Sequence, residues 1–322
     1  MTLEEIFNQG TAGKVIAELK NHRITEQPDT EEAKKALDPK LHDINNEALR
    51  PDKRVKVDGG NDSGDKVIET GEDGGNYRIE KVARVAIALQ KLIINRVVSF
   101  VFGNPVAYNA TPETDKQEAV LKALNRVLYD NKTTSMNRKI ARSIFGFKEC
   151  AELWYVQEKS KPHNTYGFQT NKKLRCALFS PMFGDTLYPY FDNTGDLIAF
   201  SRSYSRTGSD KKRYDYFETY TDTEHWLWVN GANGYEIADG FPKKVAIGKI
   251  PIVYGYQEHF ETQDVDSLID RLEKLLSNFA DTNDYHASPK IFVTGQINGW
   301  SKKGEAGAVI EGEEGATMNY VS

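Results

Sequence analysis

The sequence has few cysteines, no long apolar run free of charge and no excess of basic residues. Only two of its 322 residues are cysteine, Cys150 and Cys176, and neither belongs to a CxxC pair, so a disulfide framework is excluded and a reducing compartment is indicated. The most apolar stretch, residues 82–102, contains Arg84 and Arg96, which are costly in lipid. The net charge of −5 argues against a protein that holds nucleic acid by neutralising phosphates.

Motifs of phosphate-binding, metal-binding and catalytic sites are also missing. Residues 10–14, GTAGK, lack the first glycine and the Ser or Thr of a Walker loop, and the six histidines are scattered without metal-ligand spacing. Asp281 and Asp284 are close to one helical turn apart, but two carboxylates alone make a weak cation site, and a solvated helix face is the simpler interpretation. We therefore expect no enzyme activity, no cofactor and no metal.

The first half of the chain contains short helical patterns, a glycine-rich stretch and then longer helical patterns. Residues 51–75 are rich in Gly, Asp and Lys, which predicts an exposed excursion or hairpin. Apolar residues then recur at intervals of three and four, which predicts helices over residues 78–102, 114–129 and 135–147. Gly103 is predicted to cap the first of these helices in a left-handed conformation.

The hydrophobic period changes to two after the third of these helices. Between residues 148 and 240, short runs rich in Tyr, Phe, Trp and Val alternate with turn signals such as Asn230-Gly231. This pattern predicts an antiparallel β segment, and the chain as a whole is predicted to belong to the α+β class.

A helix of a different character is predicted over residues 264–286. Its apolar residues form one continuous stripe that has no second helix in this chain to cover it, so we expect the stripe to be a subunit interface: Val265, Leu268, Ile269, Leu272, Leu275, Leu276 and Phe279. Three carboxylates lie roughly opposite the stripe on the same helix: Asp266, Asp270 and Glu273.

Several segments together resemble the portal proteins of tailed bacteriophages of the SPP1 type. In order and spacing they match that family over residues 78 to about 295: LQKLIINRVVSFVFGNPVAYNA, GFKECAELWYV, FSPMFGDTLYPYFDNTGDLIAFSRSYSR, GKIPIVYGYQE and DVDSLIDRLEKLLSNFADTNDYHASPKIFVTG. Members of that family usually continue with a returning stem helix, a tunnel loop and a crown, and the sequence up to Ser322 contains no counterpart of these.

The resemblance implies a domain plan and a function. Residues 1–77 would form N-terminal helices and an exposed loop region, 78–260 a wing domain, 261–288 a stem helix and 289–322 the start of a clip-like region. The protein would be a homo-oligomeric ring, most often a dodecamer, at one vertex of the virion capsid, made in the host cytoplasm. Double-stranded DNA would be packaged and ejected through it, and Asp266, Asp270 and Glu273 would line its channel. Its partners would be the terminase motor, the major capsid and scaffolding proteins and a head-tail adaptor, with no membrane.

The charge of the last part of the sequence agrees with a DNA conduit. Residues 261–322 contain eleven acidic and five basic residues, and a wall of net negative charge repels phosphates and lets DNA slide. Two other classes stay open. An aromatic-rich carbohydrate-binding or adhesin-like module would use rings such as Tyr216 and Trp226, and a metal-dependent phage hydrolase would need clustered carboxylates.

Overall fold

The computed structural model describes residues 2–57, 69–231, 234–287, 290–294, 297–300, 310–312, 315 and 317–321. The chain divides into two compact units. Unit 1 contains Met1–Leu37 and Gln90–Asp264, and unit 2 contains Asp38–Leu89 and Val265–Ser322. The antiparallel sheets and helices confirm the α+β class.

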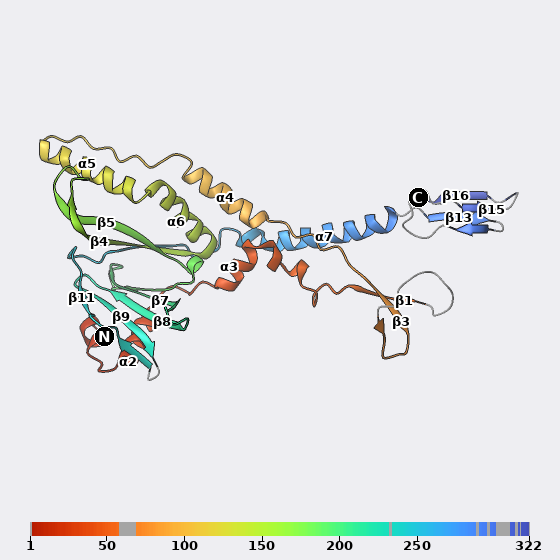
Figure 1. The fold of residues 1–322 in the computed structure, drawn as a ribbon, viewed down its shortest axis with the longest axis horizontal. Helices are drawn as coiled ribbons and strands as arrows, with labels where there is room; N and C mark the ends of the chain where they lie inside the picture. Colours follow the sequence, from red (N-terminus) through yellow and green to blue (C-terminus); the bar gives the residue numbers. More distant parts are fainter. Residues whose placement is uncertain are drawn as a thin grey trace. The chain divides into compact units, whose positions relative to one another are not determined.

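Unit 1 is built on two antiparallel sheets (Figure 1). The larger has the order β10-β9-β8-β7-β6, with β11 beside β9, and the smaller has the order β12-β4-β5. The period-two segment is therefore confirmed. The strands are β4 (Glu149–His163), β5 (Thr170–Phe179), β6 (Thr186–Phe191), β7 (Leu197–Thr207), β8 (Arg213–Tyr220), β9 (Glu224–Gly231), β10 (Gly234–Ile237), β11 (Lys243–Lys244) and β12 (Ile252–Tyr256).

The helices of unit 1 include two that the sequence predicts closely. The predicted helices 114–129 and 135–147 are present as α5 and α6, which lie along β5 and β4 (Figure 1). The five helices that lie wholly in this unit are α1 (Leu3–Phe7), α2 (Ala12–Asn21), α3 (Thr30–Leu37), α5 (Asp115–Asp130) and α6 (Thr133–Phe147), and α4 (Leu89–Val101) begins at its boundary.

Alternation along the strands of the larger sheet places apolar side chains on both of its faces. One face packs Phe217 and Trp228 against α1 and α2, where Ile6 and Leu19 are fully buried. The other face packs Phe200 against the smaller sheet. A third cluster joins α4 to α6 through Ile94, Val98 and Ala141. Unit 1 therefore has continuous apolar layers on both sides of one central sheet.

One edge of the smaller sheet is closed by a side chain. Asn131, directly after α5, donates from Nδ2 to the carbonyl of Leu174 at 3.0 Å and accepts the N–H of Cys176 at 3.0 Å. Its amide thus replaces a neighbouring strand along part of β5. The opposite edge of this sheet is β12, and no described strand pairs with its outer side.

Unit 2 contains a long helix, a small sheet and short strands. Its elements are the 3-10 helices η1 (Pro39–Leu41) and η2 (Asp43–Asn45), the sheet of β1 (Lys53–Val57), β3 (Asn76–Glu80) and β2 (Glu69–Thr70), the helix α7 (Gln263–Ala287), and the strands β13 (Lys290–Thr294), β14 (Ile297–Trp300), β15 (Ile310–Gly312) and β16 (Thr317–Val321). The first two residues of α7 are assigned to unit 1. The hairpin predicted within 51–75 corresponds to β1–β3, although residues 58–68 lie outside the described residues.

The predicted helix 78–102 is wrong over its first part. Residues 76–80 form strand β3, residues 81–88 are neither helix nor strand, and α4 begins only at Leu89. The physical reason is that alternate backbone N–H groups of residues 83–87 bind side chains of α7, which a helix could not offer. The predicted left-handed cap at Gly103 is wrong, because Gly103 does not have a positive φ. Glycine is required at this position because a Cβ there would lie 2.7 Å from the carbonyl oxygen of Ser99.

Candidate assembly helix

Helix α7 forms because its sequence is amphipathic over its whole length. Apolar residues recur at intervals of three and four, and polar residues fill the rest of the circumference. The predicted helix 264–286 is confirmed, with bounds Gln263–Ala287. Two of its faces have distinct surroundings within unit 2.

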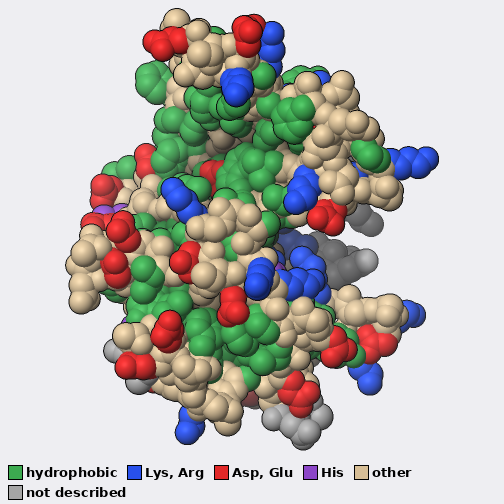
Figure 2. Space-filling model, turned by 90° about the vertical axis from the view of Figure 1, so that its left-hand side faces the viewer, with side chains coloured by type: hydrophobic (Ala, Val, Ile, Leu, Met, Phe, Trp, Pro, Cys, Tyr) green, Lys and Arg blue, Asp and Glu red, His purple; other side chains and the backbone are tan. Residues whose placement is uncertain are grey.

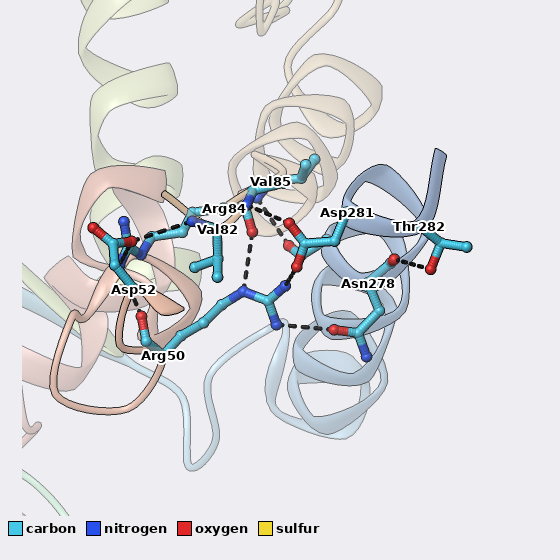
Figure 3. Close-up of polar contacts among 10 residues, drawn as sticks. Arg50, Asp52, Val82, Arg84, Val85, Asn278, Asp281 and Thr282 are labelled. Carbon is cyan, nitrogen blue, oxygen red and sulfur yellow. Dashed lines mark hydrogen bonds and ion pairs between the residues drawn. The ribbon is translucent and has the colours of Figure 1, made fainter. Parts of the chain in front are cut away.

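The first face binds an extended segment of the same unit (Figure 3). The N–H of Ile87 donates to Glu273 Oε1 at 2.7 Å, the N–H of Val85 to Ser277 Oγ at 2.9 Å, and the N–H of Ala83 to Asp281 Oδ1 at 2.7 Å. Residues 83–87 with these three acceptors are called the α7 latch below. Every second backbone N–H of the segment therefore meets every fourth residue of the helix.

This pairing is possible because two periods nearly coincide. Two residues of extended chain advance about 6.6–6.8 Å, and four residues of α-helix advance about 6.0 Å. The mismatch of about 0.7 Å per step is small over three bonds and accumulates over more. The latch is thus long enough to fix the register of the segment on α7, and its geometry limits how far it can extend.

The buried end of the latch is Glu273. Its side chain is almost completely buried, and besides the Ile87 N–H it accepts a hydrogen bond from His42 Nδ1 at 2.6 Å. A carboxylate in such a position is stable only when donors replace the lost water. His42 comes from the turn between η1 and η2, so this carboxylate ties three separate parts of unit 2 together.

The other end of the latch is closed by Arg50 (Figure 3). Its guanidinium donates from Nη2 to Asp281 Oδ2 at 2.7 Å, from Nη1 to Asn278 Oδ1 at 2.9 Å and from Nε to the carbonyl of Ala83 at 3.0 Å. A planar guanidinium suits three such acceptors because its five N–H groups have fixed directions. Arg84 in turn donates to the Arg50 carbonyl and to Asp52 Oδ1, both at 2.8 Å.

The second face of α7 is the apolar stripe predicted as a subunit interface. Four of its side chains are exposed, with exposed fractions of 67% for Leu268, 39% for Leu272, 50% for Leu275 and 70% for Phe279. Ile269 is buried, and Val265 and Leu276 are half-buried. The stripe therefore presents a row of uncovered apolar side chains one helical turn apart.

The structure corrects one of the three carboxylates predicted to line a channel. Glu273 is buried and bonded within the latch, so its side chain does not form part of an exposed wall. Asp270 is exposed and Asp266 is half-buried. The spacing of Glu273, Ser277 and Asp281 is visible in the sequence as a polar row, but nothing local in the sequence identifies its partners, which lie almost two hundred positions earlier.

The aromatic rings considered for carbohydrate binding and the carboxylate considered for cation binding contact other groups of the chain. Trp226 stacks on Phe7 at 5.0 Å between ring centroids and Tyr216 on Tyr204 at 5.2 Å, so these rings pack within unit 1. Asp281 binds Arg50 and the Ala83 N–H. No group of three or more potential metal ligands occurs among the described residues. On the face shown in Figure 2, acidic and basic side chains are interspersed.

The comparison with known families identifies the class of protein. The chain matches the family model described as phage portal protein, SPP1 Gp6-like, over residues 16–320, and it therefore belongs to that family. A search of curated proteins finds no match. The family supports phage portal function in general and a place in the virion capsid. Within the described part of the chain, no helix has the length and apolar character needed to cross a membrane.

Proposed function

We propose that this chain is one subunit of a portal ring, most often a dodecamer, at one capsid vertex. In this proposal double-stranded DNA enters and leaves the capsid through the centre of the ring, and residues 261–288 are the stem helix beside the channel. The wing would comprise residues 78–260 and the clip-like region would begin at 289. The terminase motor, the major capsid and scaffolding proteins and a head-tail adaptor would be its partners.

The observation that carries the proposal is the exposed stripe on α7. Exposing four large apolar side chains to water is unfavourable. Burying one such side chain in a contact stabilises that contact by roughly 1.5–3 kcal/mol. The same stripe of a neighbouring copy, repeated around a closed ring, covers it economically. The carboxylates of Asp270 and Asp266 remain the proposed channel-facing charges, because a negative wall does not retain phosphates.

The assembly test is to replace Leu268 and Leu275 together by Asp. Both side chains are at least half exposed, so we expect the subunit to fold, and we expect the ring to be lost because two charges would enter every subunit boundary. The matched control is the double replacement Ser267→Asp and Lys274→Asp, which places the same residues at exposed polar positions of α7 outside the stripe.

Light scattering and electron micrographs distinguish the outcomes. Rings in the wild type and the control, with single subunits in the leucine variant, support the proposal. Rings in the leucine variant would show that the stripe is not the interface. A wild type without rings would contradict the proposed function itself.

A further inference from the structure

We propose that a second surface joins copies of this chain, formed by strand β12 of one copy and residues 104–112 of the next. This inference deepens the proposed function, because it names an additional contact by which subunits assemble. It rests on unit 1 alone and not on α7.

The first half of the contact is the open edge of the smaller sheet. Trp154 N–H donates to the Pro251 carbonyl at 2.9 Å and Gln257 N–H to the Lys148 carbonyl at 2.8 Å. In an antiparallel ladder bonded residues alternate, so the backbone groups of Ile252, Tyr254 and Tyr256 face away from β4. Among the described residues, no strand pairs with them.

Other sheet edges in unit 1 carry features that prevent pairing with a further strand. The edge strand β6 contains Pro189, the edge strand β10 is only four residues long and contains Glu236, and β5 is closed by Asn131. Strand β12, with the sequence IVYGY, contains neither proline nor charge. Its Val253 and Tyr256 side chains are 59% and 50% exposed. An uncharged, β-prone open edge is a template for another extended chain.

The second half of the contact is the connection between α4 and α5. It crosses from one helix to the other without regular structure (Figure 1). Every residue from 103 to 113 is exposed. Pro105 and Pro112 bias the chain toward extended conformations. Between them the sequence VAYNAT places Val106 and Tyr108, each 48% exposed, two positions apart. Across the described chain, no hydrogen bond to the backbone of residues 104–112 is found within the subunit.

The two halves complement each other in hydrogen bonding and in apolar character. Each has a short row of unpaired backbone groups, and each has exposed β-branched and aromatic side chains, the residue types that favour strands. They are different surfaces of one unit, so pairing them between copies is a head-to-tail contact. Such a contact generates a ring when the rotation closes. A second copy of this chain is therefore the occupant that the structure supplies.

A cysteine experiment tests this contact directly. Val253→Cys is combined in one chain with Val106→Cys, Tyr108→Cys or Ala110→Cys, so that the three pairs sample neighbouring registers. Cys150 and Cys176 provide little background, because burial raises the pKa of each thiol to about 12. Under mild oxidation we expect at least one pair to give a ladder of linked copies on a denaturing gel, and we expect each single variant to give none.

A charge variant provides the second measurement. Val253→Lys should weaken self-association about tenfold or more, as a lysine on an open edge opposes strand addition. Ile237→Lys is the matched control, since Ile237 lies on the edge strand β10 and is 48% exposed. We expect this control to assemble as the wild type does.

Each outcome decides the inference. Dimers from Val253→Cys alone would mean that two β12 strands pair symmetrically, which overturns it. Rings without a ladder, together with normal assembly of Val253→Lys, would also overturn it and would leave the proposed portal function intact. A ladder without rings would support this contact and contradict the closed ring. Single subunits with no ladder would contradict both proposals.

Discussion

Unit 1 and unit 2 are each stabilised internally by a different kind of interaction. Unit 1 has three buried apolar clusters, whereas none of the clusters found in the described part of the chain includes a residue of unit 2. Unit 2 instead holds its extended segment on α7 by directional bonds from backbone N–H groups to Glu273, Ser277 and Asp281. Apolar burial supplies most of the free energy of folding but is not directional, whereas hydrogen bonds fix one register.

This difference has a consequence for an assembling protein. Because the latch occupies one face of α7 with polar groups, the apolar stripe with Leu268 and Phe279 stays uncovered within the chain. An apolar core in unit 2 would have buried the side chains of the stripe. The polar latch thus fixes the position of the extended segment on α7 and leaves the apolar side chains of the stripe exposed.

The largest expected effect is on the stability of unit 1. Phe217 is completely buried between Tyr188 and Trp228, at centroid distances of 5.7 and 5.9 Å. We expect Phe217→Ala to lower the free energy of unfolding of unit 1 by about 3–5 kcal/mol, because the lost burial leaves a cavity. Chemical denaturation followed by tryptophan fluorescence measures this, with the exposed Phe168→Ala as the control.

If the two units are stabilised by different interactions, Phe217→Ala should leave the α7 latch intact. Amide hydrogen exchange at Ala83, Val85 and Ile87 should remain as slow as in the wild type under conditions where unit 1 is still folded. If these amides lost protection together with the core of unit 1, the two units would not be independently stabilised.

A smaller effect is expected from breaking the latch. Glu273→Ala removes one carboxylate and leaves the Ile87 N–H and His42 Nδ1 without their acceptor, at a cost of about 2–3 kcal/mol. We expect exchange of the latch amides to accelerate on the order of a hundredfold, while the unfolding of unit 1 is unchanged. Asp270→Ala, an exposed carboxylate on the same helix, is the control. Equal acceleration in both variants would show that losing any carboxylate of α7, and not the bond from Glu273 to Ile87, exposes these amides.

The same contrast explains which parts of the fold the sequence reveals. Helix α7 and the aromatic strands of unit 1 were predictable, because apolar residues recur along them with the period of a helix or of a strand. Helices α5 and α6 were predictable for the same reason. The interface role of the stripe stays a prediction, which the Leu268 and Leu275 variant tests.

The latch was not predictable, because its hydrogen bonds use backbone N–H groups that carry no sequence information. Val82, Val85, Ala86 and Leu89 happen to follow a helical period, which led to the wrong helix start, and only contact with Ser277 and its neighbours shows why the chain is extended there. Glu273 was assigned to a channel wall for a related reason. A carboxylate opposite an apolar stripe is normally solvated, and its burial depends on His42 and Ile87 from distant parts of the sequence.

The smallest expected effect concerns a turn that occurs once in each unit. Residues 70–77 of unit 2 and 207–214 of unit 1 share the pattern T-G-x-D-x-x-x-Y. In both, the glycine N–H donates across the turn at 2.8 Å, and the tyrosine hydroxyl donates to the aspartate Oδ2, at 2.6 Å from Tyr77 and 2.7 Å from Tyr214. The residue after the aspartate has a positive φ in each case, 73° at Gly74 and 64° at Lys211.

The two turns therefore differ in how well one residue suits its backbone. A left-handed φ costs a residue with a Cβ roughly 1 kcal/mol, whereas glycine adopts it freely and instead loses more conformational entropy on folding. We expect Lys211→Gly to stabilise unit 1 by about 0.5 kcal/mol and Gly74→Lys to destabilise the β2–β3 hairpin by about 1 kcal/mol. Thermal unfolding measures the first, and amide exchange at Tyr77 and Arg78 measures the second. Gly208→Ala is the control for the turn itself, since its Cβ would lie 2.7 Å from Asp210 Oδ1 and should destabilise whichever residue occupies position 211. A loss of stability in Lys211→Gly would mean that the conformational entropy lost by glycine outweighs the relief of strain. Position 211 in unit 1 would then favour a residue with a Cβ despite its positive φ.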